Sequence, residues 1–230
     1  TPEPAGRTNA VMDLITVTRR IAATGLALRG GFHPAAQDAV PGGTRTLILV
    51  GDQGGRLWPH FKANRRDEPD PLDAWTERVL APAAADLGAR VVYPFGGPPH
   101  HPFQQWAMRA EGLKPSPIGP LTHPEFGLWH SYRGALLFAG MIDLGPPPAD
   151  AHPCDGCVDR PCLSACPVNA FGETGFDLPA CLGHLRAAEG VECMTGGCLA
   201  RRACPVGAGH AYGPEHQAFL AHSFLAAFGS

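Results

Sequence analysis

Cysteine is missing from residues 1–153 of this 230-residue chain, and neither a long apolar run nor a marked excess of one charge appears anywhere. The apolar segments stay below the ~20 residues that a membrane-spanning helix needs. Lys and Arg number 18 and Asp and Glu number 21, so the formal net charge is −3. We therefore expect no membrane association, and the charge gives no reason to expect a nucleic-acid partner.

Two further absences narrow the class of protein. Residues 1–9 are polar, so no secretory signal peptide is expected. The glycines after the apolar run 46–50 form neither G-x-G-x-x-G nor a Gly-Lys-Ser/Thr ending, which weighs against a phosphate-binding loop. With 44% hydrophobic and 17% charged residues, the composition is that of a soluble globular protein of one or two domains.

The cysteines that are absent earlier are concentrated in residues 154–204. They are Cys154, Cys157, Cys162, Cys166, Cys181, Cys193, Cys198 and Cys204. The segment nearly repeats itself, because Cys-Leu-Ser-Ala-Cys-Pro-Val at 162–168 is echoed by Cys-Leu-Ala-Arg-Arg-Ala-Cys-Pro-Val at 198–206. Each copy also has a cysteine five positions upstream. A duplicated cysteine motif that ends in Cys-Pro is typical of proteins with two iron–sulfur clusters.

Other uses of eight cysteines stay open at this point. Two structural zinc sites would use the same number of thiols, but they do not need paired Cys-Pro motifs. Dense disulfides are typical of small secreted chains, and this chain is long enough to bury a core. We favour iron–sulfur clusters, and we expect a reducing, cytoplasmic location because metal-binding thiols must stay unoxidised.

The cysteine segment resembles the dicluster ferredoxin domain, with departures from its usual C-x2-C-x2-C-x3-C-P spacing. The first copy is two residues longer in the middle, and the second copy has Gly190 where a first cysteine would stand. In that family the cysteine before proline ligates the other cluster. The resemblance therefore implies two [4Fe-4S] clusters. The first ligand set is Cys154, Cys157, Cys162 and Cys204, and the second ligand set is Cys166, Cys181, Cys193 and Cys198.

Before the cysteines the pattern is mixed α and β. Periodicity and Gly/Pro positions predict helices at 11–28, after residue 55, at 71–87 and at 103–110. They also predict a buried strand at 46–50 and a second strand at 89–95. A hairpin is expected from 127–132 and 135–142, with Arg133-Gly134 as its turn. Three prolines at 146–148 predict the boundary between domains 1–148 and 149–230. A last helix, 214–228, should pack back onto the rest of the protein.

A second resemblance concerns His123-Pro-Glu-Phe-Gly-Leu-Trp129-His-Ser-Tyr-Arg133-Gly134. This run is similar to the matching stretch of the CblC-type, vitamin B12-processing proteins. The resemblance implies a nitroreductase-like α+β domain that binds cobalamin, followed by the ferredoxin-like two-cluster domain, as in the epoxyqueuosine reductase and reductive dehalogenase families. It covers about residues 45–205. His123, Trp129 and Arg133 are the candidate cofactor-binding residues, and no catalytic residue is assigned.

Two functional hypotheses follow. In the first, the protein is an oxidoreductase whose clusters pass electrons to a corrinoid, or less favourably a flavin, in the amino-terminal domain. In the second, it is a ferredoxin-like electron carrier or maturation partner without a second cofactor. Both require a redox partner protein, and the first also requires a corrinoid or other small-molecule ligand.

Overall fold

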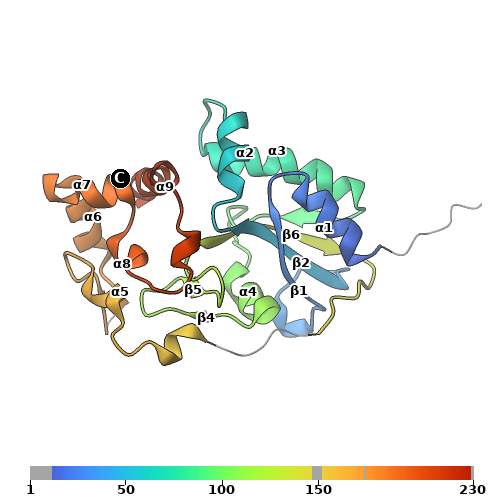
Figure 1. Cartoon of the computed structure of the whole chain (residues 1–230). Coiled ribbons are helices and arrows are strands. Elements are labelled where there is room, and N and C mark those ends of the chain that lie inside the picture. The colour runs from blue at the N-terminus through green and yellow to red at the C-terminus, as the bar shows by residue number, and fades with distance from the viewer. Residues whose placement is uncertain (1–11, 147–151, 174, 229–230) are drawn as a thin grey trace, which may run out of the picture.

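A four-stranded antiparallel sheet forms the centre of the computed structural model, which describes residues 12–146, 152–173 and 175–228. The strands lie in the order β1, β2, β6 and β3, and helices cover both faces of the sheet (Figure 1). Their bounds are β1 Ala27–Phe32, β2 Thr46–Gln53, β3 Arg90–Val92 and β6 His130–Phe138. The mixed α+β class expected from the sequence is confirmed.

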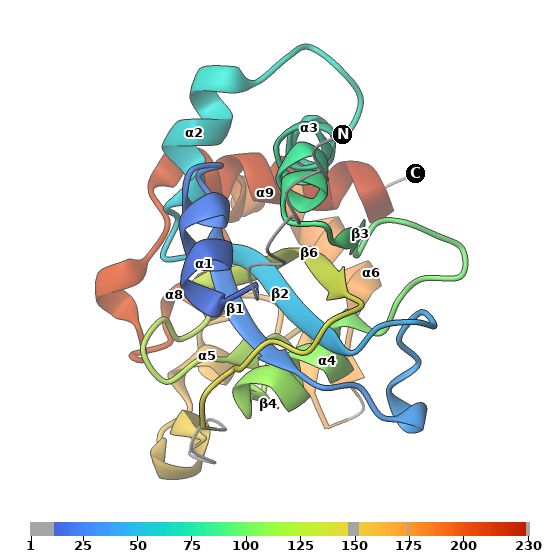
Figure 2. The same ribbon diagram turned by 90° about the vertical axis from the view of Figure 1, so that its right-hand side faces the viewer.

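Helices α1, α2 and α3 lie on one face of the sheet and α4 lies on the other (Figure 2). Their bounds are α1 Leu14–Ala22, α2 Leu57–Asn64, α3 Pro71–Asp86 and α4 Phe103–Glu111. Alternation along β2 explains the two layers: Ile48 and Val50 enter the core beneath α1 and α3, whereas Leu47 and Leu49 enter the core beneath α4.

The carboxy-terminal part is built from short helices around the cysteines. They are α5 Pro161–Ser164, α6 Leu178–Arg186, α7 Val191–Gly196, α8 Leu199–Arg202 and α9 Pro214–Phe228. A small hairpin, β7 Phe171–Gly172 with β8 Gly175–Phe176, belongs to this part, and a second one, β4 Lys114–Pro115 with β5 Leu121–Thr122, lies between α4 and β6. Helix α9 packs back onto α2 as predicted: the ring centroid of Phe219 lies 5.4 Å from that of Trp58 and 5.3 Å from that of Phe61.

Two predicted elements are wrong. The helix expected at 11–28 ends at Ala22, and residues 27–32 form β1 instead. Gly25, with a φ of +85°, makes the turn between them, a conformation that L side chains rarely adopt. Residue 11 itself lies outside the described part of the chain.

In place of the expected hairpin with a turn at Arg133-Gly134 there is one continuous strand, β6, which pairs with β2 along its length and with β3 at residues 135–137. Gly134 is needed for close packing, because a Cβ there would lie 2.5 Å from Leu80 Cδ2 of α3. The predicted boundary at 146–148 falls largely outside the described residues, so the division into domains 1–148 and 149–230 stays a prediction.

Candidate functional site

The eight thiols are all free and fall into two groups by proximity. Burial raises the pKa of Cys162, and the neighbouring Cys204, Cys154 and Cys157 raise it further. Burial likewise raises the pKa of Cys181 to about 11, with contributions from Cys198, Cys166 and Cys193. The thiols that act on Cys162 are thus those of the first ligand set, and the thiols that act on Cys181 are those of the second.

The first ligand set lines a narrow hollow between residues 116–128 and the cysteine segment. Its walls include all four of these cysteines together with Ser116, Leu128, Arg160, Val206 and several prolines. Thr122 of β5 lies within hydrogen-bonding distance of the Cys154 sulfur, at 3.5 Å. Three of these thiols come from residues 154–162, and Cys204 comes from the second copy of the motif.

The second ligand set lies further from the sheet, among α6, α7 and α8. Cys181 is on α6, Cys193 is a buried residue of α7, and Cys198 is the exposed residue that precedes α8. The backbone N–H of Ala170 donates to the sulfur of Cys166 at 3.3 Å. Among the described residues, no group of three or more His, Cys, Asp or Glu side chains is arranged to hold a single metal ion.

Close backbone contacts join the sheet to the segment that follows Cys204. Gly127 and Gly207 both have positive φ, and their backbones meet with no space for side chains. A Cβ on Gly127 would lie 1.8 Å from the Val206 carbonyl oxygen, and one on Gly207 would lie 2.2 Å from the Phe126 carbonyl carbon. The turn at 123–127 is therefore fixed against the chain that carries Cys204.

A cavity of about 300 Å³ opens next to the start of β6, and we refer to it as the β6 cavity. Its wall residues come from both parts of the chain and include Leu128, His130, Tyr132, Arg133, Arg201, Tyr212 and His216. Leu128 also lines the hollow of the first ligand set. One leucine thus belongs to the walls of both spaces, which makes them neighbours.

Aromatic rings make up much of the wall that the carboxy-terminal segment contributes to the β6 cavity. His216 is stacked between Trp58 and Tyr212, with ring centroids 4.5 and 4.1 Å away. Tyr212 in turn meets Trp129 edge-on at 5.4 Å. Burial lowers the pKa of His216 to about 4, so this ring is neutral at pH 7. Flat aromatic side chains of this kind can lie against a flat ligand.

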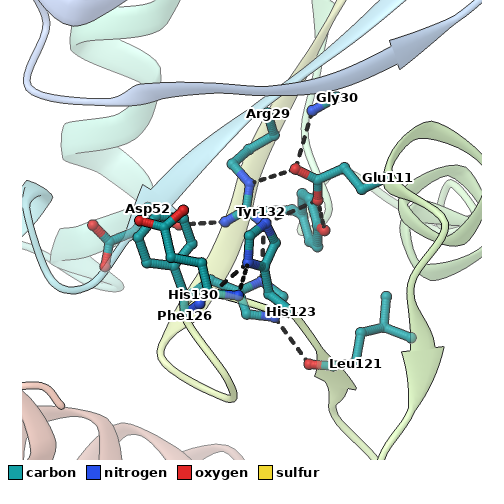
Figure 3. Close-up of polar contacts among 10 residues, drawn as sticks. Arg29, Gly30, Asp52, Glu111, Leu121, His123, Phe126, His130 and Tyr132 are labelled. Atoms are coloured by element: carbon teal, nitrogen blue, oxygen red, sulfur yellow. Dashed lines mark hydrogen bonds and ion pairs between the residues drawn. The ribbon is translucent and has the colours of Figure 1, made fainter. Parts of the chain in front are cut away.

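Behind the β6 cavity lies a buried ion pair between β1 and α4 (Figure 3). Arg29 Nε and Nη2 donate to the two carboxylate oxygens of Glu111, both at 2.9 Å, and the Arg29 side chain is fully buried. Glu111 also accepts from the Gly30 N–H at 3.1 Å and from the Tyr132 hydroxyl. Burial opposes ionisation of Glu111, but the Arg29 charge outweighs it and lowers the Glu111 pKa.

The same network fixes the tautomer of His130 (Figure 3). Arg29 Nη2 lies 3.3 Å from His130 Nδ1, and a guanidinium can only donate, so Nδ1 accepts. Nε2 therefore carries the proton and donates to the Leu121 carbonyl oxygen at 2.9 Å. Burial, followed by the Arg29 charge, lowers the pKa of His130 to about 4. A neutral imidazole of fixed orientation results.

The three residues proposed from the sequence as cofactor contacts have different positions. His123 lies in the turn before β6, where its Nδ1 accepts from the N–H groups of Glu125 and Phe126 at 3.1 Å. Trp129 is buried, with 1% of its surface exposed. Of the three, only Arg133 is among the residues lining the β6 cavity, and its guanidinium is paired with Asp73 and hydrogen-bonded to Thr76.

Sequence reasoning missed several residues that shape this site. They are Arg29, Glu111, Arg201, Tyr212 and His216. Arg29 and Glu111 are 82 residues apart, and no local pattern connects them. The short spacing of His130 and Tyr132 along an apolar strand was the one available signal, since alternate residues of a strand share a face.

Comparison with known proteins identifies structural neighbours but no family. No family model and no curated protein matches the chain. The fold is similar to a crystal structure of epoxyqueuosine reductase with an epoxyqueuosine-modified tRNA-Tyr stem loop, at a TM-score of 0.51 and 13% identity, covering 87% of this chain and 67% of that one. It is also similar to epoxyqueuosine reductase from Bacillus subtilis, at a TM-score of 0.50 and 14% identity, covering 86% and 68%.

One expectation from the sequence is corrected by these neighbours. The net charge gave no reason to expect a nucleic-acid partner, yet a protein of this fold is seen with a tRNA stem loop. Net charge averages over the whole surface, whereas nucleic-acid binding depends on where the cations lie. In the part of the chain that the structure describes, no helix combines the length and apolar character required to cross a bilayer.

Proposed function

We propose that this protein is an iron–sulfur oxidoreductase with two [4Fe-4S] clusters, one on each ligand set. The observation that carries the proposal is the grouping of eight free thiols into two neighbourhoods of four. Each neighbourhood takes one cysteine from the other copy of the motif, as in two-cluster ferredoxins. The free thiols also favour a reducing compartment, so we propose a cytoplasmic location.

The surroundings of the thiols fit a cluster. The backbone N–H of Ala170 donates to the sulfur of Cys166 at 3.3 Å, and the backbone N–H groups of Leu199 and Val206 act to lower the pKa of Cys193 and Cys204, against the effect of burial. Such donors stabilise the negative charge of a thiolate-bound cluster. Apolar and proline side chains around the first ligand set limit access of water. When bound, the clusters would supply one-electron carriers. The protein would hold the first of them against the β6 cavity.

We further propose that the β6 cavity receives a corrinoid, with flavin as the less favoured choice. Leucines and the rings of Tyr132, Tyr212, His130 and His216 line much of the cavity, and its two lining histidines are held neutral. Leu128 lines both this cavity and the hollow of the first ligand set. A cofactor there would sit close to the proposed cluster in a fixed position, which is what electron transfer between them requires.

A second candidate is an electron carrier without a cofactor in the cavity. It is favoured by the structural roles of two residues of the resemblance motif: Trp129 is buried in the interior, and Arg133 is paired with Asp73. On this reading a redox partner protein would exchange electrons with the second ligand set, where Cys198 is exposed.

The substrate class that we propose is a nucleic acid. The support is the fold neighbour that holds a modified tRNA stem loop. Fluorescence anisotropy of a labelled tRNA stem loop would test this part, with the binding repeated at several salt concentrations. Association through phosphate contacts weakens with salt because it releases counterions, so the slope shows how much of the binding is to the backbone. Absence of binding at low salt would exclude a nucleic-acid substrate.

Titration of the anaerobic protein with cobalamin tests the cavity assignment. Binding in the base-off form should shift the cobalamin absorption bands, and Arg133→Gln should weaken binding because Arg133 lines the cavity. Arg90→Gln is the matched control, since Arg90 bonds to the loop at 41–44 instead. His123→Ala should have the smaller effect of a residue in the adjoining turn. Unchanged spectra at high micromolar cobalamin would leave the carrier hypothesis as the better one.

A further inference from the structure

Arg201 lies at the wall between the β6 cavity and the hollow of the first ligand set. It lies on α8, and its Nε and Nη2 donate to the Leu128 carbonyl oxygen at 3.1 and 2.6 Å. The guanidinium lies over the rings of Trp129 and Tyr212, 4.6 and 4.7 Å from their centroids. Arg201 lines the β6 cavity, and the residue that it holds, Leu128, lines the cavity and the hollow.

Arg201 differs from the neighbouring arginines because no carboxylate in the described part of the chain is paired with its charge. Arg133 is paired with Asp73, and Arg202 is paired with Glu192. Within the described ranges no carboxylate lies within 4.0 Å of the Arg201 guanidinium. It is held instead by a neutral carbonyl and two aromatic faces, which accept a cation without cancelling its charge.

The other ionisable side chains of the β6 cavity do not offset this cation. His130 and His216 are neutral at pH 7, and the Arg133 charge is balanced by Asp73. The cavity wall therefore carries one cation without a carboxylate in direct contact among the described residues. The buried Asp52 carboxylate, which also acts on Tyr212, is bonded to the N–H groups of Gly55 and Leu57 and not to Arg201. At a partly buried site such a charge acts strongly, because little water screens it.

We propose that Arg201 sets the reduction potential of the cofactor in the β6 cavity, which rests on the cofactor assignment made under the proposed function. A fixed positive charge stabilises the form of the cofactor that has gained an electron. The bound cofactor is thus easier to reduce than it would be beside a neutral wall. The same side chain positions Leu128, which lines both the cavity and the hollow of the first ligand set. By making the cofactor easier to reduce, Arg201 favours electron flow from the cluster towards the cavity.

Four variants separate the charge of Arg201 from its packing. Arg201→Gln removes the charge, and Arg201→Met removes it while keeping an apolar stem between Trp129 and Tyr212. Arg201→Lys keeps the charge but cannot make the paired donation to Leu128. Arg202→Gln is the control, because it removes an arginine from the same helix whose charge is already paired with Glu192.

The measurement is a spectroelectrochemical titration of the anaerobic, cobalamin-loaded protein, with iron content determined on each variant. We expect Arg201→Gln and Arg201→Met to lower the cobalamin midpoint potential, while Arg201→Lys and Arg202→Gln stay near the original protein. Equal shifts for Lys and Gln would overturn the electrostatic role and leave Arg201 as a packing residue. No shift in either neutral variant would overturn it as well. If neither the original protein nor any variant binds cobalamin, the cofactor assignment itself fails, and the inference fails with it.

Discussion

Replacing Glu111 by glutamine should destabilise the fold far more than an ordinary loss of one ion pair. Glu111 bonds both Nε and Nη2 of Arg29, and the arginine side chain is fully buried. Glutamine keeps the size but cannot balance the guanidinium charge. Removing one partner of a buried pair costs about 3–5 kcal/mol, because the other charge stays buried without compensation.

Urea unfolding at pH 7 measures this effect, with Glu215→Gln as the matched control. Glu215 pairs with Lys62 on the surface, where both side chains are about 60% exposed. Exposed pairs contribute little because water screens them. We therefore expect a large fall in the unfolding free energy for Glu111→Gln and an unchanged midpoint for Glu215→Gln.

The pH dependence supplies a second arm of the same experiment. The Glu111 pKa is lower in the folded protein, so the unfolded state binds more protons and stability rises with pH across this range. The contribution is complete above the ordinary carboxyl pKa and is lost as pH falls through the folded one. The difference between the original protein and Glu111→Gln should narrow below about pH 4. Two results would refute the reasoning. One is an equal loss of unfolding free energy for both glutamine variants at pH 7, and the other is a stability difference between the original protein and Glu111→Gln that does not change with pH.

Three further outcomes are expected. Cys166→Ser should remove the electron paramagnetic resonance signal of the cluster on the second ligand set and leave the first largely intact; loss of only the first would reverse the crossed assignment. Cys181→Ser should lower the iron content, whereas full retention of iron would make Cys181 a buried helical cysteine without a metal. Gly127→Ala should destabilise by about 1–3 kcal/mol in thermal or urea unfolding, since its Cβ would strike Val206, whereas Gly140→Ala, with open space around it, should not.

Local patterns predicted the helices and strands that have a clear hydrophobic period or a Gly or Pro at their ends. The apolar run 46–50 lies in β2, and the helix expected at 71–87 is α3, Pro71–Asp86, with Gly88 just beyond its end. Pro82 lies inside α3 without ending it. The carboxy-terminal helix was also found, because its aromatic residues pack onto α2.

The failures came from glycines whose role depends on distant residues. Gly30 and Gly31 belong to β1, where the backbone packs closely against Ala110 and Leu47. Gly134 makes room for Leu80 and does not form a turn. Sequence spacing alone does not distinguish a glycine that turns the chain from one that allows close packing.

The candidate site shows the same limit. The repeated cysteines could be assigned to two ligand sets from spacing and resemblance, and the thiol neighbours follow that partition, although ligation stays a prediction. The Arg29–Glu111 pair and the position of Arg201 depend on tertiary packing between segments far apart in sequence. No pattern within one segment contains that information.

The most direct test of the central claim is anaerobic purification followed by analysis of iron, acid-labile sulfide, zinc, cobalt and flavin on one sample. Two cubane clusters predict about eight irons and eight sulfides per chain. Cobalt near one per chain after incubation with cobalamin would support the corrinoid. Two zincs per chain with no acid-labile sulfide would contradict the account.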